Sequence, residues 1–271
     1  MSALLNGRAA PELAQHRGLH YGDGVFRTCL IYASQVVDLE MQCDVINSDA
    51  ARLGIAPAPV AELTREAAQL AREQRRGVLK MTLLRGGSAR GYRPDGAGTD
   101  RLLSSYGPPA FRVETWEQGV RAFRSSFALA TQPALAGIKH LNRLEQVLAS
   151  RDWEQGMDEA LLSDSAGRPV CGTRTNLFWV RDGALHTPAL ERCGVAGLMR
   201  RKVMALAAEL KIATRVADFS WSDAEGADEM FLTNSLIGIW PVANCGSWAR
   251  PPGPVTRRLA DRLAHPRLVS A

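Results

Sequence analysis

The order of strand-like and helix-like segments most constrains the fold of this chain of 271 residues. Apolar residues recur at helical spacing over 44–53, 59–77 and 198–211, so we predict a helix over each range. Helices and strands in this irregular order predict an α+β protein whose second half is built around a mixed or barrel-like sheet. The predicted strands are a hairpin over 3–8 with an Asn6-Gly7 turn, two strands within 27–39 that turn near Ala33-Ser34, then 78–84, one ending near Tyr106, 158–162, 176–180 and 230–233.

A glycine- and proline-containing break divides the chain into two predicted domains. Gly107-Pro108-Pro109 directly follows the strand that ends near Tyr106, and polar residues come after it. Such segments are typical of links between domains. We predict an N-terminal domain at 1–106, a link at 107–118 and a C-terminal domain at 119–271. The composition, with 46% hydrophobic and 23% charged residues, is ordinary for packed domains.

Composition and cysteine spacing narrow the class of protein. The net charge of +5 comes without the dense basic block of a nucleic-acid surface, and it suits a small anionic ligand. No run approaches the roughly 18 apolar residues of a membrane span, and no signal sequence opens the chain. No Cys-x-x-Cys pair occurs, so we predict no disulfide framework and no metal site, and we expect a reducing cytoplasm; the cysteines are Cys29, Cys43, Cys171, Cys193 and Cys245.

The segment from Gly137 to Gln146 places Lys139 between a turn residue and an amphipathic run. Lysine has an ordinary pKa of about 10.4, and it condenses with carbonyl groups once burial or a neighbouring cation lowers that pKa. Spacing alone favours a surface lysine in the first turn of a helix. The helix is predicted to begin just after the lysine, because four apolar residues recur at helical spacing: Leu141, Leu144, Val147 and Leu148.

Glycine-rich segments supply further candidate sites. The segment 17–26 holds three glycines within seven residues, and its simplest interpretation is a structural turn. The loop 85–92 carries Arg85 and Arg90 at the end of a strand, where they either clamp a carboxylate or only keep the loop soluble. The turn 194–197 feeds the helix predicted from Leu198, and a helix N-terminus suits a phosphate.

These segments together resemble the class IV aminotransferase-like family of fold type IV pyridoxal-phosphate enzymes, and within it the aminodeoxychorismate lyases. The run Gly-Ile-Lys-His-Leu-Asn-Arg-Leu-Glu-Gln from Gly137 resembles the lysine segment that forms the Schiff base, and 17–26 and 85–92 match two further motifs of the family. The resemblance extends from Leu5 to Cys245. It implies a small N-terminal α/β domain, a larger C-terminal domain with a barrel-like mixed sheet, and a homodimer.

The resemblance also implies a set of site residues. Lys139 is the catalytic residue, and it would hold pyridoxal 5'-phosphate covalently. Leu198 and Met199 would offer backbone amides to the phosphate, and the segment 233–235 would complete the phosphate site. The implied cofactor-binding residues are Lys139, Asn142, Cys171, Leu198, Met199, Asn234 and Ser235, and the implied substrate-binding residues are Tyr21, Phe26, Arg85, Arg90 and Tyr92.

Two positions depart from the family pattern. Ungapped alignment through 51–55 places Gln42 and Val45 where the family has the His and Arg of its His-x-x-Arg-Leu helix. Cys171 stands five residues before Asn176, where the family has the glutamate that holds the pyridine nitrogen. Losing one charge-assisted contact weakens binding by about 1.5–3 kcal/mol. We therefore predict weakened cofactor binding, for which Arg27 or Arg174 is a candidate substitute.

The function implied is that of 4-amino-4-deoxychorismate lyase, which forms 4-aminobenzoate and pyruvate on the way to folate. Arg85 and Arg90 would bind carboxylates of the chorismate-derived substrate, and Asn142 with Arg143 would position the lysine or the ring oxygen. Two alternatives remain open. One is a class IV amino-acid aminotransferase. The other is a divergent homologue that has lost the cofactor and acts on, or only binds, a chorismate-like ligand.

Overall fold

The computed structural model describes residues 2–9, 16–87, 91–96, 98–151, 153 and 155–269, and it divides into two compact units. The first unit ends at Ala110, inside the predicted link, and the second begins at Phe111. Ile138–Asn142 also belongs to the first unit. The lysine segment therefore belongs to the fold of the first unit, although its neighbours on both sides along the chain belong to the second.

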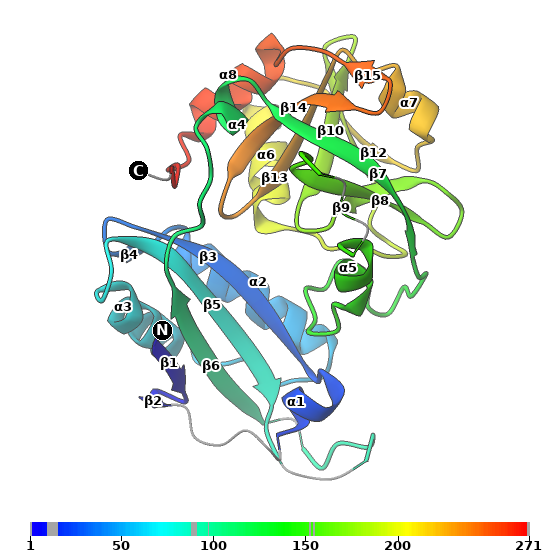
Figure 1. The fold of residues 1–271 in the computed structure, drawn as a ribbon. Helices are drawn as coiled ribbons and strands as arrows, with labels where there is room; N and C mark the ends of the chain where they lie inside the picture. Colours follow the sequence, from blue (N-terminus) through cyan, green and yellow to red (C-terminus); the bar gives the residue numbers. More distant parts are fainter. Residues whose placement is uncertain are drawn as a thin grey trace. The chain divides into compact units, whose positions relative to one another are not determined.

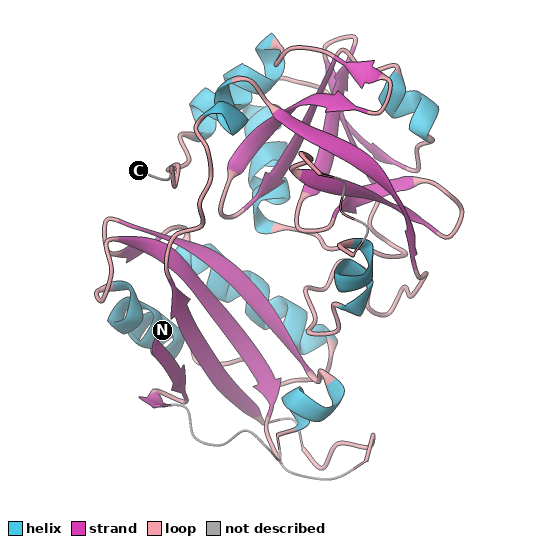
Figure 2. Cartoon of the chain, viewed as in Figure 1, coloured by secondary structure: helices cyan, strands magenta, loops and turns pink. Residues whose placement is uncertain are grey.

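The first unit is a six-stranded antiparallel sheet with two main helices (Figures 1 and 2). The strand order is β2-β1-β6-β5-β3-β4. The predicted Asn6-Gly7 and Ala33-Ser34 turns are confirmed, since all four residues have positive φ. The elements are β1 (Ser2–Leu5), β2 (Arg8–Ala9), α1 (Arg17–Tyr21), β3 (Gly24–Tyr32), β4 (Gln35–Val36), α2 (Leu39–Arg52), α3 (Val60–Ala71), β5 (Arg76–Arg85) and β6 (Thr99–Tyr106).

Helices α2 and α3 cover one face of this sheet, and several side chains of the other face are half-buried. The covered face alternates apolar side chains along β5, at Leu79, Met81 and Leu83, as expected for a strand with one face in the core. These side chains pack with Ile46 of α2 and Leu63 of α3, which are fully buried. The opposite face, which we call the open face, carries Phe26, Thr28, Lys80, Leu102 and Ser104, all half-buried.

The second unit contains a nine-stranded mixed sheet, part of which closes into a barrel. Successive pairings run β10-β13-β14-β7-β8-β9, and a pairing of Asn176 with Cys171 joins β9 back to β10. Parallel pairs join β7 to β8, β7 to β14 and β11 to β12, so the predicted barrel-like mixed sheet is confirmed. The strands are β7 (Val120–Leu129), β8 (Glu159–Asp164), β9 (Pro169–Gly172), β10 (Asn176–Arg181), β11 (Ala184–Pro188), β12 (Thr214–Ala217), β13 (Glu229–Asn234), β14 (Gly238–Cys245) and β15 (Trp248–Ala249).

Helices of the second unit pack outside these strands in separate apolar clusters. Phe178 and Phe231 stack 5.0 Å apart and pack with Val203 and Leu259, which joins two of the helices to the sheet. Another cluster places Trp116 and Trp240 edge to face at 5.8 Å. The helices are α4 (Glu114–Glu117), α5 (Leu144–Ala149), α6 (Leu198–Glu209), α7 (Trp221–Glu225) and α8 (Pro254–Leu263). No helix in the described ranges is long and apolar enough to cross a membrane.

Three helix boundaries differ from prediction by more than two residues. Helix α2 begins at Leu39, five residues before the predicted start, and α3 ends at Ala71 rather than Gly77, because β5 already begins at Arg76. The helix after the lysine begins at Leu144 rather than directly after Lys139, because the intervening residues pair with β3. Periodicity alone cannot see such a competing tertiary pairing.

Candidate active site

The lysine segment is anchored as an extra strand against the N-terminal end of β3. The Phe26 N–H donates to the Lys139 carbonyl at 2.9 Å, and the Leu141 N–H donates to the Gly24 carbonyl at 3.0 Å. Ile138 is fully buried in the core of the first unit. These contacts fix the backbone on both sides of Lys139, so its side chain extends from a rigid base.

Two ammonium groups share one aromatic ring on the open face. Lys139 Nζ lies 4.7 Å from the centroid of the Phe26 ring, and Lys80 Nζ lies 4.8 Å from it. Lys80 pairs with Thr28 of β3 on one side and Ser104 of β6 on the other, so a cation lies between two hydroxyl-bearing residues in one row of the sheet. Sequence reasoning missed Lys80, and its place in the alternating pattern of β5 was the available signal.

Asp23 joins two of the sequence motifs. Its Oδ2 accepts from Arg17 Nε at 3.1 Å and from Arg85 Nε at 3.0 Å. Arg85 Nη1 and Nη2 donate to the carbonyls of Gly54 and Leu53 at 2.7 and 2.6 Å, and Arg85 is 7% exposed. All three of its nitrogens are thus engaged within the protein. These contacts hold the end of α2 against the sheet, and the binding of a substrate carboxylate by Arg85 stays a prediction.

The two predicted tyrosines lie together. Tyr21 and Tyr92 make an edge-to-face contact with centroids 5.6 Å apart, and the Tyr21 hydroxyl accepts the Gly91 N–H at 2.9 Å. Arg17 donates to the carbonyls of Gly91 and Tyr92, which ties this loop to α1. Tyr92 is 89% exposed, so its ring is accessible to a ligand. Arg90 lies outside the described residues.

The predicted phosphate loop begins helix α6 in the second unit. Asn176 Oδ1 accepts the Gly197 N–H at 3.2 Å, and its Nδ2 donates to the Val195 carbonyl at 2.8 Å. A side chain at Gly197 would collide with Asn176 Oδ1, so this close approach requires glycine. Gly197 caps the helix without a side-chain hydrogen bond, and Leu198 and Met199 are buried, so any ligand contact at these positions is made by the backbone.

Arg200 adds positive charge to the first turn of α6. It is 9% exposed, and its described hydrogen bonds go to two neutral acceptors, Thr187 Oγ1 at 3.2 Å and the Pro188 carbonyl at 3.1 Å. Burial lowers the pKa of the Arg200 guanidinium. A buried cation and the positive end of a helix dipole both favour an anion here.

Asn234 and Ser235 lie where β13 turns into β14. The Asn234 side chain closes that turn, because its Oδ1 accepts the N–H groups of Leu236 and Ile237 at 2.8 and 3.1 Å. Its Nδ2 donates to the Arg174 carbonyl at 3.2 Å. The Asn234 side chain is therefore committed to the fold, and Ser235 is half-buried beside it.

Cys171 lies at the closure of the barrel rather than in a polar pocket. It is 6% exposed and packs in an apolar cluster with Leu129, Leu162 and Val170. Nearby Arg143 is half-buried; burial lowers the pKa of its guanidinium, and Cys171 acts in the opposite direction. Asn142 is exposed in the first unit, where its side chain donates to the Gly22 carbonyl at 3.3 Å.

The positions that depart from the family pattern are buried, and the proposed substitutes differ. Gln42 and Val45 of α2 are 1% and 2% exposed. Arg174 is half exposed, lies 3.6 Å from Glu159 and donates to the Asp158 carbonyl. Arg27, by contrast, is 3% exposed and points toward α2.

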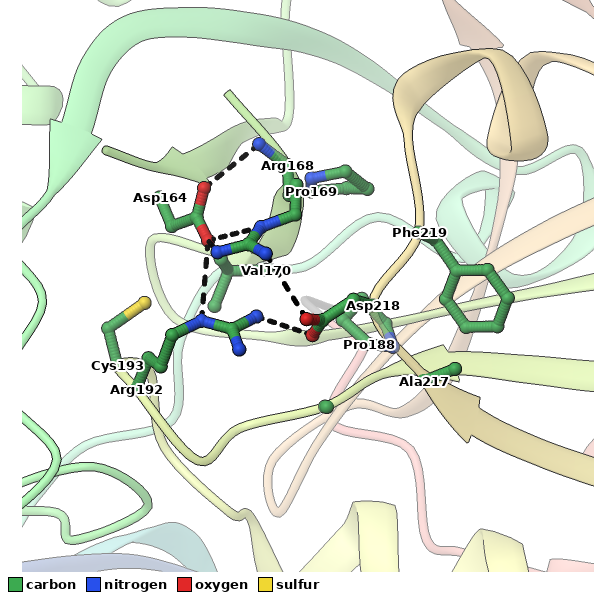
Figure 3. Close-up of a pocket in the computed structure, with 11 residues that line it drawn as sticks. Asp164, Arg168, Pro169, Val170, Pro188, Arg192, Cys193, Ala217, Asp218 and Phe219 are labelled. Carbon is green, nitrogen blue, oxygen red and sulfur yellow. Dashed lines mark hydrogen bonds and ion pairs between the residues drawn. The ribbon is translucent and has the colours of Figure 1, made fainter. Parts of the chain in front are cut away.

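A ring of alternating charges holds the loop that precedes the phosphate turn (Figure 3). Arg168 Nε donates to Asp164 at 2.8 Å, and its Nη1 donates to Asp218 at 3.1 Å. Arg192 donates to Asp218 and lies 3.9 Å from Asp164. At the start of that turn, the Gly194 carbonyl accepts the Gly137 N–H at 3.0 Å. The ring therefore supports the backbone at Gly137, two residues before Lys139 in the chain.

A sheet covered on one face by helices, a closed barrel with a glycine-capped helix, and a lysine docked on a strand are the parts of a fold type IV pyridoxal-phosphate enzyme. The chain belongs to the class IV aminotransferase family, whose model, Amino-transferase class IV, matches residues 24–245. The family resemblance read from the sequence is thereby confirmed. Enzymes of this family depend on pyridoxal phosphate.

Individual relatives include both lyases and aminotransferases. The chain is 34% identical to an aminodeoxychorismate lyase of Vibrio harveyi over 91% of this chain and 93% of that one. A crystal structure of 4-amino-4-deoxychorismate lyase from Pseudomonas aeruginosa matches with a TM-score of 0.91 and 41% identity, covering 96% and 97%. The branched-chain amino acid aminotransferase of Escherichia coli matches with a TM-score of 0.87 and 25% identity, covering 97% and 93%.

The residues fit the cofactor of the family at its phosphate end. The first turn of α6 has no side-chain cap, so its backbone N–H groups can meet a phosphate, and the buried Arg200 adds positive charge there. The nitrogen end fits less well, because the buried thiol of Cys171 stands in an apolar cluster where the family pattern has a carboxylate. A thiol is a weak hydrogen-bonding group and cannot balance a pyridinium charge as a carboxylate does.

Proposed function

We propose that this protein is a 4-amino-4-deoxychorismate lyase, which converts its substrate to 4-aminobenzoate and pyruvate for folate synthesis. The observation that carries the proposal is the pair of ammonium groups of Lys139 and Lys80 on the Phe26 ring. It provides a proton-transferring amine and a second cation on one face, which suits an anionic cyclic substrate. The likeness to two proteins named as this lyase, at 34% and 41% identity, supports the same reaction.

Lys139 carries the proton transfers of the proposed reaction. Pyridoxal phosphate, when bound, withdraws electrons from the substrate carbon that bears the amine. Once the substrate amine has replaced it on the cofactor, the Lys139 amine would take the proton from that carbon. The electron pair left there would form the new ring double bond as the carbon–oxygen bond to the enolpyruvyl group breaks, and the ring would become aromatic. Lys139 then returns a proton to the departing group, which leaves as pyruvate. Because the Lys139 backbone is held on both sides by β3, the amine stays in place through both transfers.

Binding of the anionic substrate falls to the open face. Lys80 offers a charge-assisted hydrogen bond to a carboxylate, and the flanking Thr28 and Ser104 hydroxyls are donors in the same row. Phe26 supplies an apolar surface for the ring, and Tyr92 is exposed near Tyr21. We propose Lys80 rather than Arg85 as the first partner of a substrate carboxylate, because the Arg85 guanidinium is buried among Asp23 and carbonyl groups.

We propose that pyridoxal phosphate is bound, but more weakly than the complete family pattern would allow. Lys139 would hold it covalently, and the backbone of the first turn of α6 would bind its phosphate. Two positions weaken the binding: Val45 lacks the guanidinium of the family pattern, and Cys171 lacks its carboxylate. The poor partner for the pyridine nitrogen favours the lyase over an aminotransferase, because aromatisation drives the elimination and tolerates a weaker electron sink.

The assembly and compartment are part of the same proposal. A homodimer is supported by three exposed apolar side chains on α5, since such groups in a cluster mark interaction surfaces; they are Leu144, Val147 and Leu148 at 74%, 57% and 41% exposure. A cytoplasmic location is supported by the free thiols of all five cysteines. We propose that the substrate is a small molecule, with no nucleic-acid or membrane partner.

The direct test supplies aminodeoxychorismate and pyridoxal phosphate and follows 4-aminobenzoate by its fluorescence. Lys139→Ala should abolish product formation together with the visible absorbance of the bound cofactor. Lys80→Met should raise KM about tenfold or more, as expected when one charge-assisted contact is lost, and Lys80→Arg should restore most of it. No product from folded, cofactor-supplied wild-type protein refutes the lyase, and amino transfer to a keto acid instead would identify an aminotransferase.

A further inference from the structure

A buried ion pair lies directly behind the backbone of Lys139. Arg27 on β3 and Asp49 on α2 are 3% and 7% exposed, and Arg27 Nη2 donates to Asp49 Oδ2 in a short hydrogen bond. The same oxygen accepts the peptide N–H of Lys139 at 3.0 Å. One carboxylate oxygen therefore joins a buried guanidinium to the backbone of the reactive lysine.

The geometry of β3 explains why the acceptor is a side chain. Successive residues of a strand point to opposite faces, so Phe26 lies on the open face and Arg27 on the face covered by α2. Pairing with β3 uses the Lys139 carbonyl and the Leu141 N–H. The Lys139 N–H is satisfied from α2 instead, and an unsatisfied buried N–H would cost much of a hydrogen bond.

The charge of Asp49 has a chemical consequence for the lysine. A carboxylate whose oxygen lies 3.0 Å from the Lys139 peptide nitrogen favours the protonated form of the side-chain amine, which is the unreactive form. Arg27 cancels that charge at its source. Lys80 on β5 acts in the same direction as Arg27, and the titratable ring of His140 follows Lys139 along its own segment.

We propose that Arg27 and Asp49 are a positioning pair for Lys139. Asp49 fixes the lysine backbone by accepting its N–H, and Arg27 neutralises Asp49 so that the amine is available for condensation and proton transfer. The inference rests on the proposed function only in taking Lys139 as the reactive amine. It assigns a role to two residues outside the motifs that identify the family.

The test measures the reactivity of the Lys139 amine in protein without cofactor or substrate. Trace labelling with 1-fluoro-2,4-dinitrobenzene as a function of pH, quantified by mass spectrometry of the peptide containing Lys139, gives the pKa of that amine. Arg27→Met leaves Asp49 uncompensated and should slow labelling at neutral pH about tenfold, because a nearby unit charge moves a pKa by about 1. Asp49→Asn keeps an oxygen acceptor, removes the carboxylate charge beside Arg27, and should accelerate labelling by a similar factor.

Matched controls separate the charge effect from loss of structure. The double variant Arg27→Met/Asp49→Asn contains neither charge and should label within about threefold of wild type. Exposed Lys211 in the same samples should label at an unchanged rate. Hydrogen exchange of the 138–142 peptide should accelerate in Asp49→Ala and be rescued in Asp49→Asn.

Opposite shifts in the two single variants, cancelled in the double variant, support the pair. Shifts of the same sign, or labelling rates within twofold of wild type in both folded single variants, overturn it. Because no cofactor or substrate is present, either outcome is independent of whether the lyase assay succeeds.

Discussion

Asp23 provides the most direct test of how the glycine-rich motifs work, because it joins two of them. Its Oδ2 accepts from Arg17 and Arg85, which are 3% and 7% exposed. Removing one member of a buried charge pair costs about 3–5 kcal/mol. Both guanidinium groups keep carbonyl acceptors after Asp23→Ala, so we expect a loss near the lower bound, about 3 kcal/mol. That loss corresponds to roughly a 150-fold change in an opening equilibrium.

Hydrogen exchange followed by mass spectrometry is the suitable assay, because it resolves the two units. All six tryptophans belong to the second unit, so their fluorescence reports only on that unit and serves as an internal control. In Asp23→Ala, peptides from β3 and β5 should lose protection while tryptophan fluorescence stays unchanged. Asp23→Asn should lose less, since its oxygen still accepts, and exposed Asp95→Ala should change nothing. A loss of protection below threefold in folded Asp23→Ala would refute the structural role of the hub.

Two further predictions concern the second unit. Burial alone would raise the pKa of Asp164, but hydrogen bonds from Arg168 and Ala166 outweigh it and hold this pKa below its ordinary value, and Arg192 lowers the pKa of Asp218. The stabilisation from these two carboxylates is therefore fully present above about pH 3.9 and is lost as the pH falls through the lower folded-state pKa. In an acid titration, the tryptophan fluorescence of Asp164→Asn should decrease less than that of wild type, and an unchanged profile would contradict this. Cys171→Glu should lower the melting temperature of the cofactor-free protein, because it buries a carboxylate among apolar side chains. Pyridoxal phosphate should raise the melting temperature more in this variant than in wild type. Equal increases in the two proteins would show that position 171 does not reach the pyridine nitrogen.

The sequence by itself determined the family and the local structure that periodicity and turn chemistry encode. Asn6-Gly7 and Ala33-Ser34 turn the chain because their positive φ values suit a two-residue hairpin, and the strand from Val78 and the helix from Leu198 follow from spacing. The glycines of the turn 194–197 pointed to Gly197, and the structure explains why glycine is needed there, because a side chain would collide with Asn176. Lys139 could be identified from the sequence because the motif that contains it is contiguous and can be recognised without knowledge of the fold.

Only the tertiary structure decided which charged groups are free to bind and which hold the fold together. Arg85 and Lys80 lie on the same strand, yet Arg85 is buried by Asp23 and the end of α2 while Lys80 extends to the Phe26 ring on the open face. Likewise, the residues directly after Lys139 pair with β3 instead of forming the predicted helix, and the Lys139 N–H donates to Asp49 of α2. Spacing along one strand determines the face of the sheet on which a side chain lies. It does not determine which residues the side chain contacts there, because those residues come from elements distant in the sequence.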